Sequence, residues 1–64
     1  MDLKLNIRKI RAEMKRLEIN QSELARRMGS KRQWVSFVLR HGKPVTAAVK
    51  IAKVFNLRPK DLIL

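Results

Sequence analysis

The chain has 64 residues, enough for one small domain, and its 16 Lys and Arg outnumber its 5 Asp and Glu to give a net charge of +11. Hydrophobic residues make up 45% of the chain, more than a solvated, disordered tail would carry. Cysteine is absent and histidine occurs once, which excludes a disulfide-stapled miniprotein, a Cys/His zinc site and thiol catalysis. We therefore predict a single folded, strongly basic domain over 1–64.

The N-terminal segment has the spacing of an amphipathic helix. Its apolar residues recur at steps of three and four, at Leu3, Ile7, Ile10, Met14 and Leu17. Because residues at this spacing share one face of a helix, we expect a helix from 3 to 17 with this stripe in the core. The outer face is basic and is expected to lie in solvent, with Lys4, Arg8, Arg11 and Lys15.

A second, shorter helix is predicted over 21–28. Asn20 precedes this helix and Glu23 lies in its first turn, at the spacing of a capping box. In a capping box the side chain of each residue accepts a hydrogen bond from the backbone N–H of the other. Gly29 is expected to end the helix, because glycine readily takes the left-handed conformation that follows a helix C-terminus. Ala25 is small enough to let a neighbouring helix approach closely.

Three further helices complete the prediction. The third is expected to begin at Ser30 or Lys31 and to end near Gly42, and the fourth to run over about 46–55 with Thr46 as its cap. A last helix is expected from Pro59, since proline suits a first helical turn. No alternating strand pattern competes, so we predict an all-α, compact domain of five short helices.

An enzyme is not expected from these residues. The acidic residues fall on helix surfaces or ends, with no pair spaced for general acid–base chemistry. His41 has no acid or thiol nearby in the sequence, so we interpret it as a solvated or phosphate-facing residue. We expect neither a cofactor nor a metal ion.

The informative segment is 21–40, which reads as helix, short turn and helix. This is the pattern of a helix-turn-helix, whose second helix enters the major groove of DNA while the first crosses the backbone. The segment also lies within an ordered set of residues that spans nearly the whole chain and resembles the Cro/repressor (Xre-type) helix-turn-helix family. The set is Asn20-Gln21-Ser22-Glu23-Leu24-Ala25, Gly29, Arg32-Gln33-Trp34-Val35-Ser36, Gly42-Lys43-Pro44, Ile51-Ala52 and Leu62.

The resemblance implies which side chains would face DNA. The positions that would present side chains to base edges are Arg32, Gln33, Ser36 and Phe37. Their chemistry suits that role, since Arg pairs with guanine, Gln with adenine, and an apolar ring sits against the thymine methyl. Phe37 has an alternative place in the core or in a dimer contact. The expected phosphate contacts are Gln21, Lys31, Arg40 and Lys43, and Trp34 is expected to pack rather than to read bases.

The chain departs from the family pattern at informative positions. Many relatives carry a buried Arg–Glu pair between the first and third helices, where this chain has Met14 and Leu39. Replacing both members of such a pair by apolar residues is neutral or stabilising, whereas replacing one strands a charge. The usual cap position of the recognition helix holds Lys31, so Ser30 is the expected cap. The loop after that helix also differs in length from the common pattern.

Relatives bind as dimers, so that two recognition helices meet a palindromic site. Apolar residues near the C-terminus exceed what one small core buries, which predicts a weak C2 homodimer. The residues expected at its interface are Val45, Val49, Leu62, Ile63 and Leu64.

The predicted function is sequence-specific binding of double-stranded DNA by a small repressor of phage or mobile-element type. One alternative is an antitoxin-like module that binds a protein partner and regulates its own operon. Another is a basic DNA binder without sequence preference. The longest run without a charged residue, 33–39, is far below the roughly 20 residues that span a bilayer. With no signal-peptide pattern at the N-terminus, we expect a cytoplasmic protein without a membrane partner.

Overall fold

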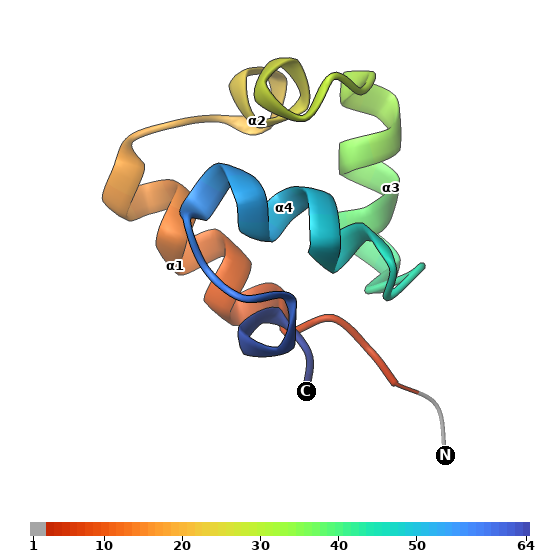
Figure 1. Ribbon diagram of the computed structural model, residues 1–64. Helices are drawn as coiled ribbons and strands as arrows, with labels where there is room; N and C mark the ends of the chain where they lie inside the picture. The colour runs from red at the N-terminus through yellow and green to blue at the C-terminus, as the bar shows by residue number, and fades with distance from the viewer. Residues whose placement is uncertain (1–2) are drawn as a thin grey trace.

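The computed structural model describes residues 3–64, and these form an all-helical fold (Figure 1). Its elements are α1 (Ile7–Leu17), α2 (Gln21–Met28), α3 (Arg32–His41), α4 (Ala47–Phe55) and the 3-10 helix η1 (Pro59–Leu62). The predicted all-α class is confirmed. The predicted count of five helices is not confirmed, because the structure has four α-helices in residues 3–64 and the last element is a four-residue 3-10 helix. No helix within residues 3–64 is long and apolar enough to cross a membrane.

Helix α1 begins at Ile7 and not at residue 3, so the predicted start is wrong. Asn6 caps the helix, and its side-chain oxygen accepts a hydrogen bond from the Lys9 backbone N–H at 3.1 Å. The residues before it pair with distant backbone instead: the Leu5 N–H donates to the Gly42 carbonyl at 3.1 Å, and the Asn6 N–H donates to the Leu62 carbonyl at 2.7 Å. These tertiary hydrogen bonds hold the N-terminal segment against the end of α3 and against η1. Figure 1 shows the C-terminal turn beside the start of α1.

Helix α2 has the predicted bounds, Gln21–Met28, because local signals set both of its ends. The Asn20 side chain accepts a hydrogen bond from the Glu23 N–H at 2.8 Å. Gly29 ends the helix in the left-handed conformation, with φ at +72°. The Glu23 carboxylate accepts hydrogen bonds from the Arg26 and Arg27 side chains. The predicted capping box is therefore present in its Asn20 half.

Helices α3 and α4 begin without the predicted side-chain caps. Lys31 occupies the cap position of α3, which has no side-chain capping hydrogen bond, so the expected cap at Ser30 is not formed. Thr46 likewise makes no capping bond, and α4 begins at Ala47. The C-terminus of α3 is as predicted, since Gly42 follows it with φ at +68°.

A single apolar cluster joins all of these elements. Met14 of α1 and Leu39 of α3 are both buried in it, and no polar or charged residue within 3–64 is buried. Leu62 of η1 has none of its surface exposed, so it belongs to the core. Its predicted place in a dimer interface is wrong for that reason. The buried residues are Leu5, Ile10, Met14, Leu24, Ala25, Val35, Val38, Leu39, Ala47, Ala48, Ile51, Ala52, Phe55 and Leu62.

Candidate nucleic-acid interface

The outward face of α3 forms an open hollow of about 280 Å³. Helical periodicity produces this face, because Val35, Val38 and Leu39 turn inward and are buried. The side chains opposite them line the hollow: Arg32, Gln33, Ser36, Phe37 and Arg40. The structure thus brings together all four predicted base-contacting residues. Arg40, predicted as a phosphate contact, lies in the same hollow.

Phe37 lies on this face and not in the core, with 51% of its surface exposed. The expected alternative of a core position is therefore excluded. Its ring lies beside that of His41, one helical turn further along α3, with 4.5 Å between the ring centroids and 47° between the planes. The sequence indicates a solvated or phosphate-facing His41 and does not predict its contact with Phe37. The i, i+4 spacing of two aromatic rings on one helix is the signal that could have found this pair.

A second hollow, of about 270 Å³, opens at the N-terminus of α2. Asn20, Gln21 and Ser22 line it together with Arg32 of α3. Arg32 also borders the hollow on α3, so the two hollows have this side chain in common. Backbone N–H groups at a helix N-terminus attract anions, so the predicted phosphate-binding residue Gln21 stands at a place suited to a phosphate oxygen.

Lys31 and Lys43 are exposed but line neither hollow. Lys31 directly precedes α3, and Lys43 follows it after Gly42, so the two flank α3 along the chain. Within residues 3–64 the ion pairs are Glu13–Arg16, Glu23–Arg26 and Glu23–Arg27. None of these pairs neutralises a cation on or beside the outward face of α3. The face therefore keeps its positive charge.

The ion pairs of α2 perturb one carboxyl group strongly. Hydrogen bonds from Arg26 and then from Arg27 lower the pKa of Glu23 to about 2. Both arginines lie one turn after Glu23, and the Arg27 Nε stands 2.8 Å from a Glu23 carboxylate oxygen. The negative charge of Glu23, in the first turn of α2, also stabilises the helix by interacting with the positive end of its dipole. The arrangement ties the two arginines to α2.

We predict a pH dependence of folding stability from this pair. A carboxyl whose pKa is lower in the folded chain stabilises the fold above its ordinary pKa, near 4.5, and this contribution is lost as the pH falls through about 2. Melting temperatures of the wild type and of Glu23→Gln should therefore differ above about pH 4.5 and converge near pH 2. Glu18→Gln removes an exposed carboxylate outside the ion pairs found in residues 3–64 and serves as control. Parallel pH profiles for wild type and Glu23→Gln would contradict the prediction.

Trp34 and the predicted dimer residues have distinct environments. Trp34 is half-buried and packs against the core, which confirms the packing role predicted for it. Val45 and Ile63 are half-buried against the same core. Val49 and Leu64 are 48% and 74% exposed. Of the five residues predicted at a dimer interface, these last two offer the apolar surface that a second chain could cover.

No group of three or more His, Cys, Asp or Glu side chains within residues 3–64 is placed to hold a metal ion. No protein-family model, no curated protein and no solved structure matches the chain. The resemblance to the Cro/repressor family therefore stays a prediction from the residues that carry it. What the chain binds must be inferred from the chemistry of its surface.

Proposed function

We propose that this protein is a small transcriptional regulator that binds double-stranded DNA sequence-specifically, with α2 and α3 acting as a helix-turn-helix. The observation that carries the proposal is the hollow on α3, where an arginine, a glutamine, a serine and an exposed phenylalanine lie on one face. Exposed Phe37 gains no core packing, and Arg32 makes none of the ion pairs found in residues 3–64. A base-pair edge offers partners to each of these side chains.

The dimensions of α3 suit the major groove. Its 10 residues give a length of about 15 Å, and a helix with its side chains is roughly 10–12 Å wide, against a groove about 12 Å wide. The turn from Gly29 to Lys31 separates α3 from α2. With α3 in the groove, the hollow at Gln21 faces the adjacent backbone, where it would hold a phosphate. Arg32 would then read a guanine and Gln33 an adenine.

Basic side chains around α3 supply affinity without sequence information. Lys31 and Lys43 are the flanking phosphate contacts in this proposal, and Arg40 reaches either a phosphate or a base edge from the α3 hollow. The net charge of +11 adds a general attraction to DNA, which weakens as salt rises. A cytoplasmic location follows from the proposed target, and occlusion of a promoter is the simplest means of repression.

Lys43→Ala is expected to weaken binding to specific and random duplexes by similar factors. Each phosphate contact releases counterions, so its loss should lower the slope of log K against log salt concentration by about 0.9 per bound chain. Fluorescence anisotropy at four or more salt concentrations measures both slopes. An unchanged slope would show that Lys43 does not contact a phosphate, and Lys60→Ala, in η1, supplies the matched removal of an exposed lysine elsewhere.

Sequence-specific binding by so short a recognition helix needs two copies of it. One α3 spans only a few base pairs, so we propose a weak C2 dimer on half-sites about one helical turn apart. Val49 in α4 and Leu64 after η1 supply the exposed apolar surface. Half-buried Val45 lies shortly before α4, and half-buried Ile63 directly precedes Leu64. Leu62 has no part in this interface because it is fully buried.

Selection from a randomised duplex pool at near-physiological salt, with random DNA as competitor, tests the proposal. Enrichment of a two-fold-symmetric site with half-site centres about one turn apart is the expected result. Enrichment of a single short site would retain specific recognition and overturn the dimer. Recovery of unrelated sequences, with binding that collapses as salt rises, would overturn sequence-specific recognition and leave a basic DNA binder.

A further inference from the structure

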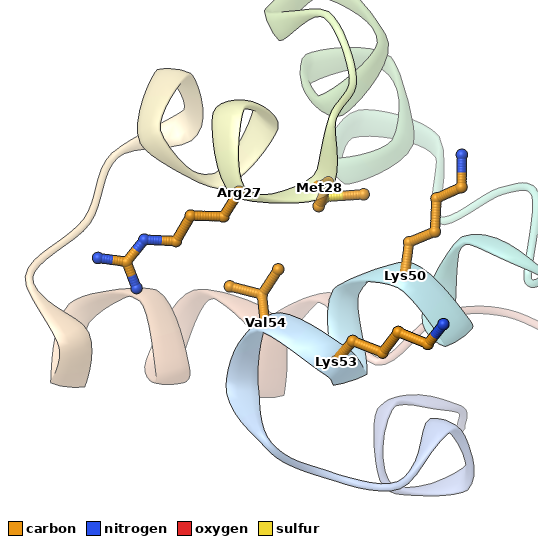
Figure 2. A pocket seen from close by; sticks show the side chains of 5 residues that line it. All are labelled: Arg27, Met28, Lys50, Lys53 and Val54. Carbon is orange, nitrogen blue, oxygen red and sulfur yellow. The ribbon is translucent and has the colours of Figure 1, made fainter.

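A separate hollow lies between α2 and α4 and has no part in the proposed contact with DNA. It has a volume of about 360 Å³ and shares no residue with the hollows on α3 and at the N-terminus of α2. Figure 2 shows Met28 and Val54 facing each other between the two helices, with Arg27 extending to one side and the two lysines standing on the other. The lining residues are Arg27, Met28, Lys50, Lys53 and Val54.

The floor of this hollow is apolar and only partly covered. Met28 and Val54 are half-buried and pack against the core, so each leaves part of its side chain in solvent. Met28 is the last residue of α2 and Val54 lies in the last turn of α4, so the floor lies between the C-terminal ends of the two helices. An apolar side chain from outside would remove the remaining surface of both residues from water, which is favourable in proportion to the area buried.

The rim of the hollow is positively charged. Lys50 and Lys53 are exposed, and neither belongs to an ion pair found in residues 3–64. The Lys50 ammonium stands 5.8 Å from the centroid of the Trp34 ring, within the range of a cation–π contact. The Arg27 side chain donates a hydrogen bond to Glu23 and lines the hollow on the side opposite the two lysines. The two lysines are thus the cations available to a ligand.

We propose that this hollow is a docking site for an acidic peptide segment of a partner protein, one that carries a large apolar side chain between its carboxylates. The apolar side chain covers Met28 and Val54, and the carboxylates pair with Lys50 and Lys53. Charge complementarity identifies the occupant, because the rim is cationic and the chain as a whole carries a net charge of +11. The inference does not rest on the proposed function.

A nucleic-acid backbone satisfies only part of this surface. Phosphates would pair with the lysines, but they would leave the apolar floor against water or against a charged group. An acidic peptide with a leucine meets both the rim and the floor. The apolar contact is therefore the property by which the two kinds of ligand are distinguished experimentally.

The experiment uses the full 64-residue chain and two fluorescein-labelled hexapeptides of equal charge, Glu-Asp-Leu-Leu-Asp-Glu and Glu-Asp-Ser-Ser-Asp-Glu. The leucine peptide should bind about tenfold more tightly than the serine peptide, because only leucine covers the floor. It should also shift the backbone amide resonances of Met28 and Val54. Lys53→Glu should weaken its binding about tenfold, since attraction to the carboxylates becomes repulsion.

Lys60→Glu is the matched control, because it makes the same charge change at an exposed lysine outside the hollow. An equal loss of peptide binding in Lys53→Glu and Lys60→Glu would overturn the proposal and reduce the interaction to overall charge. Equal affinity for the leucine and serine peptides would overturn the role of the floor and with it the proposed occupant. If Lys53→Glu instead weakens random duplex DNA as strongly as it weakens the peptide, the hollow is a nucleic-acid contact and the proposal fails.

Discussion

Replacing Arg32 or Gln33 by alanine is expected to lower affinity for the selected DNA site by roughly 5- to 150-fold, while binding to random duplex changes little. The range corresponds to the 1–3 kcal/mol of discrimination that one bidentate contact to a base provides, at about 1.4 kcal/mol per factor of ten. Both side chains are exposed on the outward face of α3, so truncation at Cβ removes the base contact without disturbing the core. Loss of affinity should therefore come without loss of folding stability.

The two substitutions should also relax specificity at different positions of the site. Without Arg32 the discrimination for its guanine disappears, and without Gln33 the discrimination for its adenine disappears. Competition binding with single-base variants of the selected site measures each effect. Arg8→Ala removes an exposed cation of α1 that lines neither the hollow on α3 nor the hollow at the N-terminus of α2, and it should leave base preference unchanged.

A different result would contradict base reading by these residues. Equal losses on specific and random duplex from Gln33→Ala would place Gln33 outside the base contacts and make it a phosphate or sugar contact, since glutamine side chains also donate hydrogen bonds to the DNA backbone. Equal losses from Arg32→Ala would make Arg32 a phosphate contact. Arg32 borders the hollow at the N-terminus of α2 as well as the hollow on α3, so the salt slope of its alanine variant decides between the two roles.

The sequence predicts best where neighbouring residues decide the structure. Helix α2 was predicted with its observed bounds because Asn20 caps it within its own first turn and Gly29 ends it with a left-handed residue. The start of α1 was wrong for the opposite reason. The Leu5 N–H donates to the Gly42 carbonyl, far along the chain. No local sequence pattern distinguishes an apolar residue in a helix from one whose backbone makes such a distant hydrogen bond.

The candidate site follows the same rule. The resemblance to the Cro/repressor family implied that Arg32, Gln33, Ser36 and Phe37 face the same way, and the structure places all four around one hollow on α3. Whether Phe37 lies in the core depends on how α3 packs, and only the structure excludes that alternative. The hollow between α2 and α4 was not predicted, since Met28 and Val54 come together only when the two helices pack.

The buried positions Met14 and Leu39 provide the second large effect. Met14→Arg is expected to destabilise the fold by about 3–5 kcal/mol, the cost typical of an unpaired charge in a protein interior. Met14 belongs to the same apolar cluster as Leu39, and no polar or charged residue within 3–64 is buried to pair with a guanidinium. Most of the stability of a small domain would be lost, which thermal or urea unfolding measures directly.

Leu39→Glu should be destabilising for the same reason, but the two substitutions together should cost less than the sum of their separate effects. Relatives in the family that the chain resembles join the first and third helices by a buried Arg–Glu pair at these positions, and the double variant would restore that pair. A double-mutant cycle isolates the coupling energy, which is expected to be favourable by 0.5–3 kcal/mol, roughly the range for residues in contact. If Met14→Arg destabilises too far for measurement, Met14→Lys and Leu39→Gln provide a milder cycle.

Additive losses would show that Met14 and Leu39 do not meet, although both are buried in one cluster. That result would remove one support for aligning the chain with the family, since the paired apolar change is informative only if the two positions are partners. It would leave the outward face of α3 untouched, because Arg32 and Gln33 take their positions from the periodicity of their own helix. The resemblance first indicated base contacts for these residues, but the hollow that they share on α3 is observed in the structure. The cycle therefore tests the pairing of positions 14 and 39, and the binding measurements test the base contacts.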